Sequence, residues 1–194
     1  EPVILEASCL GVLCDVERYV LRTSAEPMML TPGLKRLMDE PNPLIVAKST
    51  LRARVHRRTT ADYVGVRRYN AKGEVIGEIR FVGLFTSESF TEPTRNIPVL
   101  RRKADWVMKQ AGFTPGGHNA KTLRKIIESY PREELWQMSR EELLEITRGI
   151  LHLLDRPRAR VFLRRDRFNR FATALAYVPK DRYDTTVPER IGQA

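Results

Sequence analysis

The clearest hydrophobic pattern in the chain lies between residues 62 and 87, where apolar and polar positions alternate along two arms. Residues 62–69 and 74–85 form these arms, and both are rich in β-branched and aromatic side chains. Asn70 opens the intervening stretch and Gly73 closes it, which suits a type I turn whose last residue has a positive φ. The pattern predicts a long β-hairpin that serves as the scaffold, with its second arm covered on both faces near its end.

Shorter alternating runs precede this hairpin. Residues 44–48 and 51–57 are predicted to be two strands that pair with it, and His56 falls on the basic, solvated face of the second. Glycines within the arms are interpreted as bulges and not as ligand contacts. The first forty residues predict short strands and one short helix, at residues 3–5, 10–13, 19–21 and 34–38.

After residue 93 the apolar period changes from two to three or four, which predicts three amphipathic helices over residues 97–111, 123–130 and 140–154. Asn96 is the candidate cap of the first helix and Gly112 its terminator. A capping box at residues 139–142 starts the third. The acidic side chains cluster near helix starts, which indicates capping and not catalysis, and they are Glu133, Glu134, Glu141 and Glu142. Gly116-Gly117 lacks the spacing of a phosphate-binding loop and is interpreted as an ordinary connection.

A second hairpin is predicted over residues 160–178, around a turn at 166–170. A further capping box at residues 186–189 starts a helix for which only eight residues remain, so we expect the segment to come from a longer polypeptide. The ribbon would then pair with another copy or be disordered, because it offers uncovered apolar surface at Val161, Leu163, Phe171, Thr173 and Leu175.

Composition adds a basic charge to this picture. The 194 residues are 42% hydrophobic and 30% charged, as in ordinary globular proteins, but the net charge is +10. Arginine clusters at residues 52–68 and 156–170 suit nucleic acid, an acidic protein surface, or carboxylate and phosphate ligands. Cys9 and Cys14 are too few for a disulfide framework, and the histidines have no paired metal-ligand spacing. With no apolar run of membrane-spanning length and no signal peptide pattern, we expect a cytoplasmic protein.

Several runs together resemble the large bacterial NAD-dependent glutamate dehydrogenases. The resemblance covers about residues 43–190, and the matching runs are specific in combination and order, although none is a catalytic signature. They are Pro43 to Val46, Val55 to Arg57, Asp62 to Val66, Arg80 to Ser87, Ile97-Pro98, Leu100 to Lys103, Tyr130 to Leu135, Gly149 to Leu153, Arg156 to Arg158, and Tyr177 to Tyr183.

The resemblance implies an α+β fold taken from the N-terminal half of these long enzymes. Residues 1–88 would be most of one ACT-like antiparallel module, 89–156 a helical motif, and 157–194 the truncated start of a further ACT-like module. Nothing here resembles the catalytic core of the family or its Gly-rich nucleotide-binding turn, so we expect no catalytic, cofactor-binding or metal residue in this segment. NAD is the cofactor implied for the parent enzyme.

The function implied by the resemblance is a non-catalytic regulatory or assembly segment of an enzyme that oxidatively deaminates glutamate to 2-oxoglutarate and ammonia. Its partners would be other domains of the same long chain and other subunits, with an amino acid as a possible effector, because ACT modules bind amino acids at module interfaces. The alternative is an arginine-rich nucleic-acid-binding module, supported by the net charge and by Phe162, Phe168 and Phe171 among arginines. No recognised nucleic-acid motif accompanies these residues.

Overall fold

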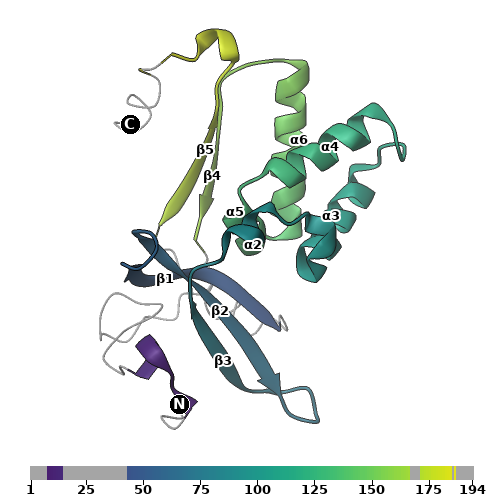
Figure 1. Ribbon diagram of the computed structural model, residues 1–194. Helices are drawn as coiled ribbons and strands as arrows, with labels where there is room; N and C mark the ends of the chain where they lie inside the picture. The colour runs from purple at the N-terminus through teal and green to yellow at the C-terminus, as the bar shows by residue number, and fades with distance from the viewer. Residues whose placement is uncertain (1–7, 15–42, 167–170, 185, 187–194) are drawn as a thin grey trace. The chain divides into compact units, whose positions relative to one another are not determined.

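The computed structural model describes residues 8–14, 43–166, 171–184 and 186, and the chain divides into two compact units, Glu1–Thr91 and Glu92–Ala194 (Figure 1). Antiparallel strands and helices confirm the predicted α+β class. The elements expected at residues 3–5, 19–21, 34–38 and after Thr186 lie outside the described residues.

The first unit contains an antiparallel sheet of β1 (Leu44–Ala53), β2 (Thr59–Tyr69) and β3 (Val75–Gly83), in the order β1-β2-β3. The predicted pairing of an early strand with the hairpin is confirmed. The prediction of two early strands is wrong, because β1 is one strand with a pairing irregularity between Lys48 and Arg52. There the Ser49 hydroxyl accepts a hydrogen bond from the Leu51 amide at 3.0 Å.

The predicted turn between β2 and β3 is confirmed. The Gly73 amide donates to the Asn70 carbonyl at 3.0 Å, and Gly73 has a φ of 81°, which glycine adopts without a Cβ clash. The Asn70 side-chain oxygen accepts from the amides of Lys72 and Glu74, both at 2.9 Å. These bonds satisfy the turn backbone locally and fix the register of the hairpin.

The two faces of this sheet are covered unequally. Tyr63 is fully buried, and its hydroxyl donates to Glu78 on the neighbouring strand. Asp62 is also buried, where it pairs with Lys48 at 2.6 Å and accepts from the Phe85 amide at 3.1 Å. Asp62 lies on the opposite face from Tyr63, and on that same face Phe81 of the edge strand β3 is 57% exposed. The expectation that both faces of this arm are covered near its end holds only in part, because Leu84 and Phe85 are half-buried whereas Phe81 is exposed.

Two further segments of this unit depart from the sequence prediction. The strand expected at residues 10–13 is wrong, since Gly11–Cys14 form the 3-10 helix η2 and Gly11 has a φ of 57°, which bends the chain. Beyond β3, the short helix α2 (Ser87–Thr91) was not predicted. It places Phe90 edge-on to Phe85 and beneath the Arg57 guanidinium.

The second unit consists of four α-helices followed by a hairpin among its described residues (Figure 1). The elements are η3 (Thr94–Asn96), α3 (Pro98–Ala111), α4 (His118–Ser129), α5 (Arg132–Gln137), α6 (Arg140–Asp155), β4 (Arg160–Arg165), β5 (Ala172–Tyr177) and η4 (Lys180–Arg182). The three predicted helices are confirmed as α3, α4 and α6. The six-residue α5 was missed.

The helix ends follow the predicted signals with one exception. Gly112 ends α3 in the left-handed conformation, with a φ of 71°, and both bonds of the capping box at the start of α6 are present. Asn96 does not cap α3, because the N-cap is Ile97 with Pro98 at the first helical positions. The Asn96 amide is bonded to Glu92 instead.

The core of the second unit lies between the helices and one face of the hairpin. Phe162 on β4 belongs to it, and Leu175 and Tyr177 on β5 pack against it. The helical members are Leu100, Ala104, Val107, Leu123, Ile126, Ile127, Tyr130, Leu135, Met138, Leu143, Ile150, Leu151 and Leu153. The terminal hairpin and the helices therefore share one hydrophobic core.

This core corrects the expectation for the terminal ribbon. Pairing of Phe162 with Leu175 and of Arg164 with Thr173 places these four side chains on the inner face, toward the helices. Leu175 and Thr173 therefore have a partner within the chain, and the prediction that they await an outside cover is wrong. The outer face stays exposed as predicted, since Leu163 is 73% exposed.

Candidate functional site

The short helix α5 carries charged side chains that hold two different parts of the second unit. Pro131 cannot continue α4, because it lacks an amide hydrogen and disfavours the helical conformation of Tyr130 before it. A new helix starts directly after it and brings Arg132 and Glu134 into the interior, where they are 6% and 8% exposed. We call Arg132, Glu134 and their bonded partners the α5 clamp.

On the hairpin side of the α5 clamp, Glu134 binds both strands. The Arg164 Nε on β4 donates to Glu134 Oε2, and the Thr173 hydroxyl on β5 donates to Glu134 Oε1 at 3.0 Å. Arg164 Nη2 also reaches Gln137 Oε1 at 3.3 Å. Burial by itself lowers the pKa of Arg164, but the hydrogen bond and the charge of Glu134 outweigh it and raise that pKa above its ordinary value. Arg164 therefore stays charged, and its bond to Glu134 holds the hairpin to α5.

On the opposite side, the α5 clamp holds the segment that begins the second unit. Arg132 Nη2 donates to the Glu92 carbonyl at 3.0 Å and lies 3.8 Å from Glu128 Oε2. Glu128 in turn accepts from the amide and the hydroxyl of Thr94, at 3.1 and 2.5 Å. Arg132 Nε and Nη1 are buried and have no hydrogen-bond partner in the part of the chain that the structure describes.

A lysine from α3 holds the end of α5. Lys103 Nζ donates to the carbonyls of Leu135 and Met138, both at 2.6 Å. A cation near the last carbonyls of a helix also interacts favourably with its dipole. Helix α5 is too short to be stable alone. Bonds from Arg132 and Glu134 hold its first turn, and bonds from Lys103 hold its end.

The arrangement has the chemistry of a structural joint and not of a reaction centre. The buried carboxylate of Glu134 is engaged by Arg164 and Thr173, so it has no open oxygen to act as a base. Among the described residues, no group of three or more His, Cys, Asp or Glu side chains could hold a metal ion, and Cys9 and Cys14 form no disulfide. No helix in the described ranges has the length and apolar character to span a membrane.

Sequence reasoning placed Glu134 at a helix start but missed its role. It was interpreted as a capping carboxylate, whereas it pairs with an arginine thirty residues away along the chain. The alternation of a strand places Phe162 and Arg164 on one face, but it does not show that this face is buried, because the neighbours Val161 and Leu163 on the other face are apolar as well.

The aromatic side chains offered for nucleic-acid stacking are not arranged as a platform. Phe162 is 9% exposed and lies in the core, edge-on to Tyr177 with ring centroids 5.8 Å apart. Phe171 is half-buried, and Phe168 lies outside the described residues. A stacking surface needs exposed ring faces, so this structure gives the nucleic-acid interpretation no support.

Tyr130, the C-cap of α4, predicts a pH dependence of stability. Burial, and secondarily the charge of Glu134, raises the pKa of Tyr130 from 10.0 to about 12. The unfolded chain then loses this proton at a lower pH than the folded chain, so the free energy of unfolding should fall as the pH rises from about 10 to about 12. Denaturant unfolding across this range should show a shallower fall for Tyr130→Phe, and an unchanged slope would contradict the prediction.

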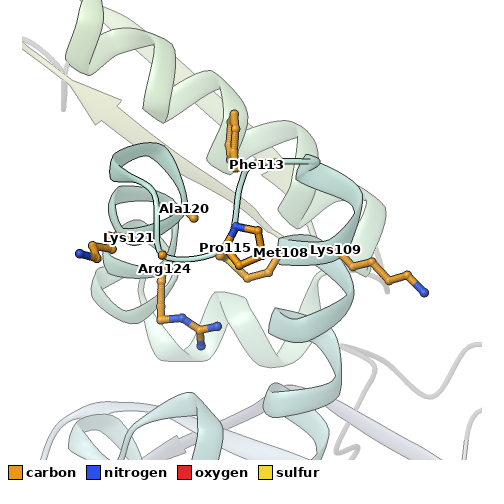
Figure 2. Close-up of a pocket in the computed structure, with 8 residues that line it drawn as sticks. Met108, Lys109, Phe113, Pro115, Ala120, Lys121 and Arg124 are labelled. Carbon is orange, nitrogen blue, oxygen red and sulfur yellow. The ribbon is translucent and has the colours of Figure 1, made fainter.

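A second feature lies at the corner where α3 turns into α4. A hollow of about 530 Å³ is lined there by Met108, Lys109, Phe113, Pro115, Gly116, Ala120, Lys121 and Arg124, and we call it the corner hollow (Figure 2). The turn at Thr114–Gly117 has Gly116 at a φ of 76° and a bond from the Gly117 amide to the Thr114 carbonyl. Figure 2 shows Lys109 and Lys121 extending away from the hollow on opposite sides.

Comparison with known families gives two matches, and both fall in the second unit. The family described as glutamate dehydrogenase, helical motif 1, matches residues 97–156, which hold α3, α4, α5 and α6. The family described as glutamate dehydrogenase, ACT2 domain, matches residues 160–194, which include β4 and β5. The α5 clamp therefore joins a side chain of the first match to two side chains of the second.

Individual relatives agree with these matches. The chain is 46% identical over 151 residues to an NAD-specific glutamate dehydrogenase of Halomonas elongata, covering 78% of this chain and 9% of the relative. It is 42% identical over 156 residues to one of Pseudomonas aeruginosa (80% and 10%), and 32% identical over 157 residues to one of Mycobacterium tuberculosis (81% and 10%). The chain thus spans about a tenth of the length of these relatives. It is related to the NAD-specific glutamate dehydrogenases, over a segment that matches their helical motif 1 and their ACT2 domain.

Proposed function

We propose that this chain is a non-catalytic regulatory and assembly segment of a large NAD-dependent glutamate dehydrogenase. The parent enzyme would oxidatively deaminate glutamate with NAD, in a catalytic region elsewhere in its chain. The observation that carries the proposal is the α5 clamp, in which Glu134 of the helical motif holds both strands of the ACT2 hairpin. A side chain that binds both strands couples any movement of the hairpin to the helices.

The division into modules is part of the same proposal. Residues 1–88 would be an ACT-like module, 89–156 a helical motif and 157–194 the start of a further ACT-like module. The partners would be other domains of the parent chain and other subunits, with an amino acid as the candidate effector. The three-stranded antiparallel sheet of the first unit and the exposed outer face of β4–β5 support this, because both present surface that a further element or subunit can cover.

The first test uses the purified chain. We expect no NADH production from glutamate and NAD above that of a heat-treated sample, because the sequence contains no Gly-rich dinucleotide-binding turn. Addition of the chain to an assay with an authentic glutamate dehydrogenase controls for inhibitors in the preparation. Turnover by the chain alone would contradict the non-catalytic assignment.

The second test uses the complete parent enzyme with Arg164→Met and Glu134→Leu together, which replaces the charged pair by apolar side chains of similar size. We expect the variant to keep turnover in saturating substrate but to change its subunit assembly or its response to a panel of amino acids. Sedimentation and initial-rate measurements report these properties separately. Wild-type assembly together with a wild-type amino-acid response would contradict the regulatory role.

A further inference from the structure

The corner hollow combines an apolar lining with an unbalanced charge. The apolar surface comes from Met108, Phe113, Pro115 and Ala120. Of these, Met108 and Phe113 also pack against the hydrophobic core. Between residues 106 and 127 the sequence contains four lysines or arginines and no aspartate or glutamate. Four acidic side chains of this unit instead lie in the first turns of α5 and α6, at Glu133, Glu134, Glu141 and Glu142.

The cations around the corner hollow are available to a partner. Lys109, Lys121 and Arg124 are exposed, and none makes an ion pair or a side-chain hydrogen bond with any residue that the structure describes. Their charges come from two helices and surround the hollow, so they do not converge on one point (Figure 2). One small anion could therefore contact only part of this set, whereas an extended partner with several carboxylates could contact all three.

We infer that the corner hollow is a docking surface for an acidic protein segment, which places an apolar side chain against Met108 and Pro115 and its carboxylates near the three cations. Oppositely charged surfaces favour encounter and fix the register of a complex, while the apolar contact contributes affinity. A nucleic acid fits less well, because the one aromatic side chain in the lining, Phe113, is half-buried and packs against the core, and a base needs an exposed ring face on which to stack. This inference is independent of whether the parent enzyme is regulated through ACT2.

The test uses two fluorescein-labelled hexapeptides with the 194-residue chain at physiological salt. One has the sequence Glu-Glu-Leu-Leu-Glu-Glu and the other Glu-Glu-Ser-Ser-Glu-Glu. Fluorescence anisotropy should show binding of the leucine peptide and at least about tenfold weaker binding of the serine peptide, which lacks the leucine side chain that packs against Met108 and Pro115. The combined variant Lys109→Gln, Lys121→Gln and Arg124→Gln should weaken leucine-peptide binding by between about threefold and about a hundredfold, because each exposed charge pair contributes roughly 0.2–1 kcal/mol.

A matched control removes the same charge elsewhere. Arg102→Gln, Arg156→Gln and Arg158→Gln change three exposed arginines outside the corner hollow, and binding should stay at the wild-type level. Equal affinity for the two peptides, or an equal loss in the control variant, would reduce the effect to general charge attraction and overturn the inference. Displacement of the leucine peptide by an equimolar single-stranded oligonucleotide would assign the surface to nucleic acid instead.

Discussion

Replacing Glu134 with alanine should lower the free energy of unfolding by about 3–5 kcal/mol, the usual cost of removing one partner from a buried ion pair. The side chains of Arg164 and Glu134 are only 6% and 10% exposed. Arg164 keeps its charge at any accessible pH, so the variant would contain a buried guanidinium without its carboxylate. The Thr173 hydroxyl would lose its hydrogen bond to Glu134, and the Arg164 bond to Gln137 would no longer be held in place by the carboxylate. Chemical denaturation followed by circular dichroism measures the change.

An exposed pair in the same unit provides the control. Arg140 and Glu141 are 2.8 Å apart, but their side chains are 55% and 61% exposed, so Glu141→Ala should cost no more than about 1 kcal/mol. The double variant with Arg164→Met and Glu134→Leu should recover most of the stability, because neither partner then remains buried with a charge. Similar losses for Glu134→Ala and Glu141→Ala would show that the α5 clamp does not hold the hairpin.

The second large effect is expected at Gly149 on α6. A Cβ atom at this position would lie 2.8 Å from Cε1 and 3.0 Å from Cζ of the Phe162 ring. That ring is held between Tyr177 and the Arg160 guanidinium, which lies 4.7 Å from its centroid, so it cannot move without displacing the hairpin. Alanine favours a helix by up to about 1 kcal/mol over glycine, but overpacking a core costs about 1–3 kcal/mol. Gly149→Ala should therefore destabilise the hairpin.

Hydrogen exchange can localise this effect. The amides of residues 160–165 and 172–177 should exchange faster in Gly149→Ala, while those of α4 stay protected. In a Phe162→Leu background the smaller side chain leaves room for the new methyl group, so Gly149→Ala should there be neutral or stabilising. The same loss in both backgrounds would mean that the Gly149 to Phe162 contact does not position the hairpin.

The features that sequence reasoning predicted well depend on local signals. Gly112 and the capping box at Ser139 mark helix ends by their own backbone chemistry, and a 3.6-residue period over three turns or more identifies the long helices. Likewise, Asn70 and Gly73 specify their turn through bonds within five residues. Each of these elements can be deduced without knowing what packs against it.

The features that were missed depend on distant partners. The six residues of α5 are fewer than two turns, so no apolar period can develop, and the helix forms because Lys103 and the core hold it. The Glu134 to Arg164 pair looks like two ordinary surface charges until the register of β4 and β5 turns Arg164 inward. The sequence could not tell which face of the β4–β5 hairpin is buried, because that depends on the helices that pack against it.

The two sides of the α5 clamp have a mechanical consequence. Arg132 holds the backbone at Glu92, and Glu134 holds β4, with one residue between them on the helix. These two Cα positions are about 3 Å apart along the helix axis at the α-helical rise of 1.5 Å per residue. Tension applied at residue 92 therefore reaches the hairpin through less than one helical turn, by a path shorter than any through the side chains of α3, α4 and α6. Such a path is short and stiff, and it makes α5 the element through which a pull on one end of this unit moves the other.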